Sequence, residues 1–367
     1  MKIASIYTGR SMSQPVLYNH LHDSVEVDLH IFKDHSEPIE QLTFSHKHNF
    51  LEVDDVTVRG QTALWATQYR LRKRWKEFLQ EEIDETYDLL IGMNELATPT
   101  VDVANYYDIS SIFFLRNLEV TGQEMYRSDR SLLSNFKHAD RGAKFQFPFF
   151  IQNFREYRRG MKNADAIVAN SEYVQKRLQT DFGVEANVIY PPITTEDFEV
   201  DYDENGYIGM VNPRNTEKGG DIFMDIVESM PSEQFLASGV FRDSELEKRC
   251  AGLDNLTHIG WCDDMREFYK QTRLVIVPSR WNEAFGRVAA EAMVSGIPCV
   301  VSNRGGLPEV VGDTGVIVDE IESVEAWKNA IKTAIKNHDP GTQIKRAQKF
   351  SAEQQTEKLI EVIDTVR

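Results

Sequence analysis

The sequence predicts an α/β protein made of two doubly wound domains, and three observations lead to this prediction. The chain has 367 residues, which is long for a single hydrophobic core. Short β-rich runs alternate with helix-compatible stretches, a pattern typical of parallel sheets covered by helices. An acidic, turn-rich stretch at 194–205 contains little apolar material and separates two series of such runs.

The first domain is expected to span residues 1–193 and to contain six strands. The β-rich runs lie at 3–8, 25–32, 87–93, 110–115, 164–169 and 187–190. Helix-compatible stretches separate several of these runs, so we expect a parallel sheet with helices on its faces.

The second domain is expected at residues 206–350 and has a more regular pattern. Its β-rich runs lie at 207–211, 234–238, 256–259, 274–277, 298–302 and 316–318. A terminal helix is expected from about 351 to 367, because apolar residues recur at helical spacing from Leu359 to Val366. Ser351 is its expected N-cap.

Charge and composition disfavour several classes of protein. The formal charge of −17 argues against a nucleic-acid-binding surface, which needs an excess of Lys and Arg on one face. Three widely spaced cysteines, Cys250, Cys262 and Cys299, fit neither a disulfide framework nor a zinc knuckle. No run approaches the ~20 apolar residues of a membrane span, and no secretory signal precedes the first strand. We therefore expect a cytoplasmic protein.

The segment from Pro278 to Glu291 carries the most informative motif. A buried strand ends, a polar loop follows, and a helix is expected to begin near Phe285-Gly286. Such loops bind ligands in open α/β sheets, and a helix N-terminus offers unpaired N–H groups to a phosphate.

Two glutamates in this segment are too far apart to share a proton. On one helix, Glu283 and Glu291 would lie about 12 Å apart on different faces. We therefore place Glu283 in the loop and Glu291 inside the helix, where each carboxylate could accept hydrogen bonds from a different diol. The alternative is that both are solvated residues at a helix start.

Two further loops of the second domain carry chemistry that suits a ligand. Arg214 and Lys218 precede Gly219-Gly220 at a helix start, an arrangement that suits a diphosphate. Gly305-Gly306 would permit close backbone approach to a ligand. Each loop alone fits ordinary surface charges or a tight turn. All three loops open at one edge of the predicted sheet, so together they indicate a binding site there.

These motifs resemble those of the retaining glycosyltransferases of the large group 1 class (family 4), which have the GT-B architecture. The resemblance rests on residues 278–291, 305–309 and 218–219, and it extends to 165–171, 189–192 and 350–351. It implies two Rossmann-like domains that face a deep interdomain cleft, an N-terminal acceptor domain and a C-terminal donor domain. It also implies a terminal helix that crosses back to the N-terminal domain.

The resemblance also implies roles for individual residues. Arg214 and Lys218 would hold the diphosphate, and Glu291 the ribose hydroxyls. Glu283 and the backbone of residues 285–287 would hold the donor sugar. The implied donor-binding residues are Gly9, Arg214, Lys218, Glu283, Phe285, Gly286, Arg287 and Glu291.

The sequence departs from the family pattern on the acceptor side. The family has Gly-Gly after the first strand, whereas Gly9 here stands alone before Arg10. The family also has a His after the strand at 110–115, where this chain has Arg116 or Asn117. We take Arg116 as the catalytic residue at this position, together with Arg214, Lys218 and Glu283.

The implied reaction moves a sugar from a UDP-, GDP- or ADP-sugar to a hydroxyl of a glycan, lipid-linked or small-molecule acceptor, with retention. No cofactor and no metal are expected, because Arg, Lys and N–H groups would stabilise the leaving diphosphate. Two alternatives stay open. One is a nucleotide-sugar-binding partner without activity, and the other is a GT-B-like epimerase acting on the sugar nucleotide itself.

A basic segment at 64–79 has two interpretations. It carries apolar residues at positions 64, 71, 75, 78 and 79, with cations at 70, 72–74 and 76. A helix with this pattern could make peripheral contact with an anionic membrane, at the inner face. Alternatively, it packs its apolar face against the core and exposes its basic face to water.

Overall fold

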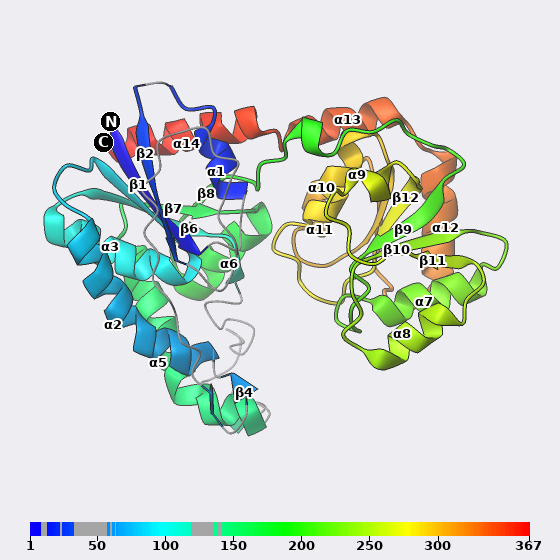
Figure 1. Cartoon of the computed structure of the whole chain (residues 1–367), viewed down its shortest axis with the longest axis horizontal. Coiled ribbons are helices and arrows are strands. Elements are labelled where there is room, and N and C mark those ends of the chain that lie inside the picture. The colour runs from blue at the N-terminus through cyan, green and yellow to red at the C-terminus, as the bar shows by residue number, and fades with distance from the viewer. Residues whose placement is uncertain are drawn as a thin grey trace. The chain divides into compact units, whose positions relative to one another are not determined.

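The computed structural model describes residues 1–8, 13–22, 24–32, 57–58, 61–62, 64–118, 136–137 and 141–367. The chain divides into two compact units. Unit 1 comprises Met1–Tyr190 and Gln355–Arg367, and unit 2 comprises Pro191–Gln354. Each unit contains a six-stranded parallel sheet flanked by helices (Figure 1). The predicted fold class is therefore confirmed.

The sheet of unit 1 has the strand order β2-β1-β5-β6-β7-β8. Its strands are β1 (Lys2–Thr8), β2 (Glu26–Phe32), β5 (Leu89–Met93), β6 (Ser110–Leu115), β7 (Ala166–Ala169) and β8 (Asn187–Val188). All six predicted runs form strands, because buried apolar runs bounded by turns suit a sheet covered on both faces. A separate antiparallel pair joins β3 (Thr57–Val58) and β4 (Gln61–Thr62).

Helices cover both faces of this sheet, and β1 shows why. Ile3 and Tyr7 belong to a core cluster with α1 (Ser13–Tyr18) and α14 (Ala352–Thr365). Ala4 and Ile6, one residue out of phase, belong to a cluster with α2 (Leu64–Glu82) and α3 (Ala97–Tyr107). Side chains alternate along a strand, so both faces are apolar. Further helices of unit 1 are η1 (Asn94–Leu96), α5 (Arg141–Asn163) and α6 (Glu172–Phe182).

The terminal helix α14, red in Figure 1, packs on unit 1 as predicted. Leu359, Val362 and Ile363 are buried in the same cluster as β1. Ser351 caps the helix, since its Oγ accepts a hydrogen bond from the Gln354 N–H at 3.3 Å.

Helix α2 packs part of the apolar face of the basic segment into the core of unit 1. Leu71, Trp75 and Leu79 are at most 4% exposed and pack against β1 and β5. Lys73 and Arg74 are exposed. The packing of these three apolar side chains agrees with the interpretation in which the helix packs against the core and exposes its basic face to water. None of the described helices is long and apolar enough to cross a membrane.

The sheet of unit 2 has the strand order β11-β10-β9-β12-β13-β14. Its strands are β9 (Tyr207–Val211), β10 (Phe235–Ser238), β11 (Leu256–His258), β12 (Thr272–Val277), β13 (Cys299–Ser302) and β14 (Val316–Val318), again at all six predicted positions. The chain starts at the centre with β9, moves outward to β11, and then returns to β12 on the other side. The carboxyl ends of β9 and β12 therefore form a topological switch point, where open α/β sheets bind ligands.

The helices of unit 2 enclose a core around the fully buried Trp327. They are α7 (Gly220–Ser229), α8 (Ser244–Ala251), α9 (Arg266–Tyr269), α10 (Arg287–Val294), α11 (Leu307–Val311), α12 (Val324–Lys336) and α13 (Pro340–Gln348). The stretch at 194–205 contains one short 3-10 helix, η4 (Thr195–Asp197), and no strand.

Candidate functional site

A pocket of about 240 Å³ opens at the switch point of unit 2. Its lining consists of the last residues of β9 and β12, the loops that follow them and the first two residues of α10. These residues are Met210, Val211, Asn212, Arg214, Lys218, Ile276, Val277, Ser279, Glu283, Gly286, Arg287 and Val288. The lining contains three cations and one carboxylate, although the whole chain has a net charge of −17. The pocket therefore suits an anionic ligand.

Three helices that follow the strands near this pocket begin without a side-chain cap. They are α7 after β9, α10 after β12 and α11 after β13. By contrast, Asp243, Ser323 and Asp339 cap α8, α12 and α13. The first N–H groups of a helix have no partner within the helix. The Gly220 N–H of α7 donates to the Asn215 carbonyl at 3.0 Å. The other first N–H groups of α7 and those of α10, whose preceding loops line the pocket, can bind an anion.

Arg214 lines the pocket with an unsatisfied donor. Its Nε is buried and has no hydrogen-bond partner among the residues that the structure describes, a costly state for a buried polar group. The Arg214 backbone is fixed, because its carbonyl accepts a hydrogen bond from the Arg242 N–H at 2.9 Å. A ligand oxygen at this position would satisfy the orphaned Nε.

Lys218 and Glu283 are brought together from two different loops. Lys218 Nζ lies 2.6 Å from Glu283 Oε1, and the two side chains are 27% and 20% exposed. Ser279 Oγ donates to the same oxygen at 3.0 Å. Glu283 precedes α10 and Glu291 lies inside it, as the spacing predicted.

Arg280 fastens the loop after β12 to its surroundings. Its guanidinium contacts both carboxylate oxygens of Asp221 on α7 and both of Glu322. The hydrogen bonds to Glu322 and then to Asp221 raise the pKa of Arg280. The Glu217 carbonyl also accepts hydrogen bonds from the Arg280 and Trp281 N–H groups at 2.9 and 3.1 Å. The loops after β9 and β12 are thus tied together beside the pocket.

The glycine pair at 305–306 has a different use from the one expected. A Cβ atom on Gly305 would lie 2.0 Å from the Glu283 carbonyl oxygen, and the Gly306 N–H donates to that oxygen at 2.7 Å. The close backbone approach is therefore to Glu283, and neither glycine lines the pocket. Gly219 allows a similar approach, because its φ is +76° and its Cβ would lie 2.0 Å from the Pro278 carbonyl oxygen.

Of residues 285–287, Phe285 is buried in the core and Arg287 lines the pocket. Phe285 is 4% exposed, and its ring packs edge-on against Phe350 with centroids 5.1 Å apart. Gly286 is the N-cap of α10 with a φ of +113°, a conformation that favours glycine. Arg287 lines the pocket.

Glu291 lies behind Arg287 and is 6% exposed. Its Oε1 accepts a hydrogen bond from Arg287 Nε at 2.5 Å, and its Oε2 accepts one from the Tyr269 hydroxyl at 2.9 Å. Burial raises the pKa of Glu291, and the charge of Arg287 opposes that shift. Glu291 is absent from the pocket lining, so a ribose would have to reach it beside Arg287.

Arg116 belongs to unit 1 and follows β6. Its backbone is held from both sides by loops that follow the neighbouring strands. The Arg116 N–H donates to Asn94 Oδ1 at 2.9 Å, and its carbonyl accepts from Asn170 Nδ2 at 2.6 Å. Gly9, the other acceptor-side residue singled out, lies outside the described residues.

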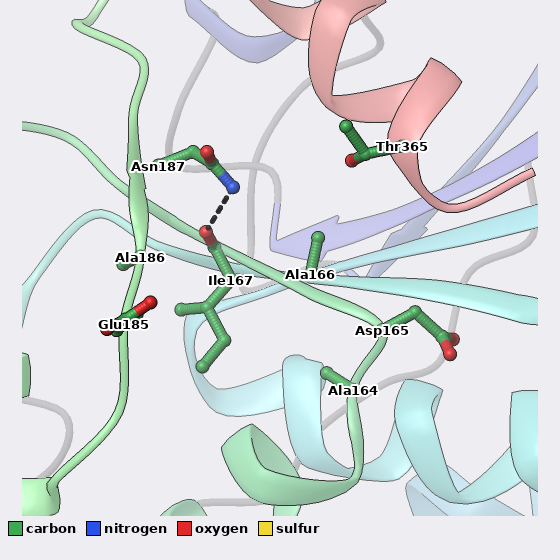
Figure 2. A pocket seen from close by; sticks show the side chains of 8 residues that line it. All are labelled: Ala164, Asp165, Ala166, Ile167, Glu185, Ala186, Asn187 and Thr365. Atoms are coloured by element: carbon green, nitrogen blue, oxygen red, sulfur yellow. Dashed lines mark hydrogen bonds between the residues drawn. The ribbon is translucent and has the colours of Figure 1, made fainter.

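A second pocket, of about 300 Å³, lies in unit 1 (Figure 2). It is lined by Ala164, Asp165, Ala166, Ile167, Glu185, Ala186, Asn187 and Thr365. Asp165 precedes β7, so this pocket lies at the amino end of the strand. The Asp165 carboxylate accepts hydrogen bonds from the Ser111 N–H and hydroxyl. None of the predicted site residues lies here.

Sequence reasoning missed two polar residues of the unit 2 pocket. Asn212 directly follows β9 with a φ of +55°, and Ser279 lies two residues after β12. Both were part of the loops considered, but neither was given a role. Their position directly after the two switch-point strands is the signal that could have identified them.

Comparison with known proteins relates this site to one enzyme family. Residues 204–337 match the family model of glycosyl transferases group 1. An uncharacterised glycosyltransferase of Methanocaldococcus jannaschii is 30% identical over 161 residues, which cover 41% of this chain and 44% of that protein. The chain thus spans less than half the length of the curated relatives it matches.

Solved structures resemble the chain over its whole length. Sucrose-phosphate synthase of Thermosynechococcus elongatus has a TM-score of 0.71 and 17% identity, covering 99% of this chain and 98% of that one. Anabaena HepE in complex with UDP-glucose has a TM-score of 0.67 and 17% identity, covering 100% of both chains. These similarities show the fold, which is the two-domain α/β fold of GT-B type.

Proposed function

We propose that this chain is a retaining glycosyltransferase that moves a sugar from a nucleoside-diphosphate sugar to a hydroxyl acceptor. The observation that carries the proposal is the pocket at the β9/β12 switch point. It combines Arg214, Lys218 and Arg287 with helix N-termini that no side chain caps. The match of residues 204–337 to glycosyl transferases group 1 supports the assignment as a glycosyltransferase.

The diphosphate of the donor would bind Arg214 and Lys218. Arg214 supplies the buried Nε that lacks a partner among the described residues, and Lys218 supplies a compact charge. The N-termini of α7 and α10 add backbone donors and the positive end of each helix dipole. Together these groups favour a ligand with two adjacent phosphates over a single carboxylate.

Glu283 and Glu291 would hold hydroxyl groups of the donor. Glu283 lines the pocket beside Lys218, which suits a hydroxyl of the sugar. Glu291 would accept hydrogen bonds from the ribose diol beside Arg287. Carboxylate oxygens can accept more than one hydrogen bond, so the contacts with Arg287 and Tyr269 leave acceptor capacity.

In the proposed reaction, the bond between the anomeric carbon and the diphosphate oxygen breaks. The acceptor hydroxyl oxygen bonds to the same carbon on the same face, and its proton passes to the leaving diphosphate. Arg214, Lys218 and the helix N–H groups would stabilise the negative charge that develops on the leaving group. This supply of positive charge is why we propose transfer without a metal ion.

Unit 1 would bind the acceptor, with Arg116 as a catalytic residue. The two asparagines that hold the Arg116 backbone support this assignment, because they fix the loop from neighbouring strands. A glycan, a lipid-linked glycan or a small molecule could each offer the attacking hydroxyl. UDP-glucose is the first donor to test, since it is bound in the structure of Anabaena HepE.

Thermal shifts with UDP-, GDP- and ADP-sugars identify the donor, because a ligand that binds the folded chain raises its Tm. Incubation of that donor with an acceptor panel, with and without EDTA, then tests transfer. An NMR coupling constant of the product gives the anomeric configuration. Inversion or loss of activity in EDTA would contradict the proposed mechanism. Donor binding without transfer would favour the non-catalytic partner, and conversion of the donor without acceptor would favour the epimerase.

A further inference from the structure

We infer that Ser279 is a positioning residue that holds Glu283 in the sugar subsite while the donor diphosphate draws Lys218 away from it. This inference rests on the proposed function, because it concerns the same pocket. It adds a residue to which neither the motif nor the comparisons give a role. It also makes completion of the sugar subsite depend on the diphosphate.

The geometry around one oxygen atom carries the inference. Glu283 Oε1 is contacted by Lys218 Nζ at 2.6 Å and by Ser279 Oγ at 3.0 Å. Its second oxygen, Oε2, accepts no hydrogen bond from the residues that the structure describes. The carboxylate is therefore held at one end and is open to a ligand at the other.

A diphosphate would compete with Glu283 for Lys218. It carries more negative charge than one carboxylate, and Arg214 and the helix N-termini beside Lys218 attract it as well. When Lys218 turns to the phosphates, the strongest contact of Glu283 is weakened. The hydrogen bond from Ser279 then keeps Oε1 in place, so that a sugar hydroxyl can donate to the carboxylate.

Ser279 is built to keep its position during this exchange. Its side chain is fully buried, and its carbonyl accepts a hydrogen bond from the equally buried Ser302 hydroxyl at 2.6 Å. The Glu283 backbone is fixed from another side by Gly305 and Gly306. Lys218 in contrast has a long side chain with several rotamers, so it can move between the two anions.

Binding of nucleotides with and without the sugar separates this role from a structural one. The probes are UDP and UDP-glucose, GDP and GDP-mannose, and ADP and ADP-glucose, measured by calorimetry on the full chain. For the pair that binds, Ser279→Ala should weaken the nucleotide sugar about tenfold. It should change the affinity for the nucleoside diphosphate less than about twofold, because no sugar is held.

A double-mutant cycle with Glu283→Ala tests whether Ser279 acts through Glu283. Glu283→Ala should weaken binding of the nucleotide sugar. It should strengthen binding of the nucleoside diphosphate, because Lys218 no longer has to break its contact with the Glu283 carboxylate. In that background, Ser279→Ala should have almost no further effect on either ligand. A full additional loss of affinity in the double variant would mean that Ser279 contacts the donor directly. Equal losses of affinity for the nucleotide sugar and the nucleoside diphosphate in Ser279→Ala would also overturn the inference.

Ser295→Ala is the matched control. Ser295 is also a buried serine, and its hydroxyl donates to the Phe198 carbonyl, but it lies at the far end of α10. Its replacement should leave both affinities unchanged. If Ser279→Ala does not fold, Ser302→Ala takes its place. It should give a smaller loss of affinity that is again confined to the nucleotide sugar, and an unchanged affinity would count against the inference.

The ligand-free chain gives a measurement that does not depend on the proposed function. Thermal unfolding of Ser279→Ala, Glu283→Ala and the double variant should show coupling between the two residues. If none of the nucleotides binds, the proposed donor site is wrong. Absence of coupling in the ligand-free chain would refute the positioning of Glu283 by Ser279, whether or not a donor binds.

Discussion

A Cβ atom on Gly305 would lie 2.0 Å from the carbonyl oxygen of Glu283, so the loops after β12 and β13 are in direct backbone contact. Gly305→Ala should therefore displace the Glu283 loop, and the φ of +60° adds strain. We expect a loss of about 2–4 kcal/mol in unfolding free energy and at least tenfold weaker donor binding. Thermal unfolding and calorimetry measure the two effects.

Gly183→Ala is the control for this substitution. Gly183 has a φ of +68° but no neighbouring atom within 4 Å of an added Cβ. Its replacement should cost only about 1 kcal/mol and leave donor binding unchanged. If the two variants behave alike, the contact with Glu283 does not control the loop.

Replacement of Arg214 should lower donor affinity, whereas replacement of Arg280 should lower stability. Arg214→Ala removes a guanidinium whose buried Nε has no partner in the described part of the chain, so we expect a Tm within about 2 °C of wild type. Donor affinity should fall about 10- to 150-fold, because charge-assisted hydrogen bonds to phosphate are lost. Unchanged affinity in calorimetry would exclude Arg214 from the diphosphate site.

Arg280→Ala instead breaks the contacts with Asp221 and Glu322. These partly exposed pairs form a network, and their loss should cost about 1–2 kcal/mol. The Tm should fall by about 3–6 °C, as differential scanning calorimetry would show. A donor affinity as low as that of Arg214→Ala would indicate that Arg280 contacts the ligand.

Glu291→Gln tests the proposed ribose contact. The substitution keeps the size of the side chain but removes the charge that draws two hydroxyl groups. Donor binding should weaken by ~2–3 kcal/mol, or roughly 30- to 150-fold. Tyr269→Phe, which removes the hydroxyl that donates to Oε2 and lies 3.4 Å from the Val288 carbonyl oxygen, is the comparison. Donor affinity equal to wild type in Glu291→Gln would contradict the assignment.

The pH dependence of stability should reveal the burial of Glu291. Burial raises the pKa of this carboxyl above its ordinary 4.5, so the folded chain binds the proton more tightly than the unfolded chain. The resulting stabilisation is complete below pH 4.5 and is lost as the pH rises through the folded pKa. The Tm of wild type minus that of Glu291→Gln should therefore decrease over this range. A constant or rising difference would show that the carboxylate is well solvated or fully paired.

The stability of unit 1 should depend on the apolar face of helix α2. Trp75→Ala should lower the unfolding free energy by about 3–5 kcal/mol, because Trp75 is 4% exposed and packs in the core of unit 1. Arg74→Ala should change it by less than about 0.5 kcal/mol, since Arg74 is exposed. Denaturant unfolding compares them, and similar effects would place Trp75 outside the core.

The strands could be predicted from the sequence because each depends on a local pattern. Residues 207–211 and 316–318 form strands with the predicted bounds, and 3–8 differs by one residue. The position of α10 was also predictable, since Gly286 can adopt the positive φ of its N-cap. These properties belong to a few consecutive residues, so no knowledge of distant contacts was needed.

The contacts within the site depend on residues far apart in the sequence and were less predictable. The partner of Gly305 is the Glu283 backbone, and the partners of Glu291 include Tyr269 from another helix. Only the arrangement of several loops determines such pairs. The sequence therefore located the pocket, while the hydrogen bonds that hold Glu283 required the structure.

The return of α14 to unit 1 has a consequence for how the chain is made. Unit 2 is inserted between two parts of unit 1, and α14 contributes Leu359, Val362 and Ile363 to the core against β1. Domains generally fold as units while synthesis proceeds from the N-terminus. Unit 2 can therefore complete its fold on the ribosome first, and unit 1 must wait with an open apolar face until α14 has emerged.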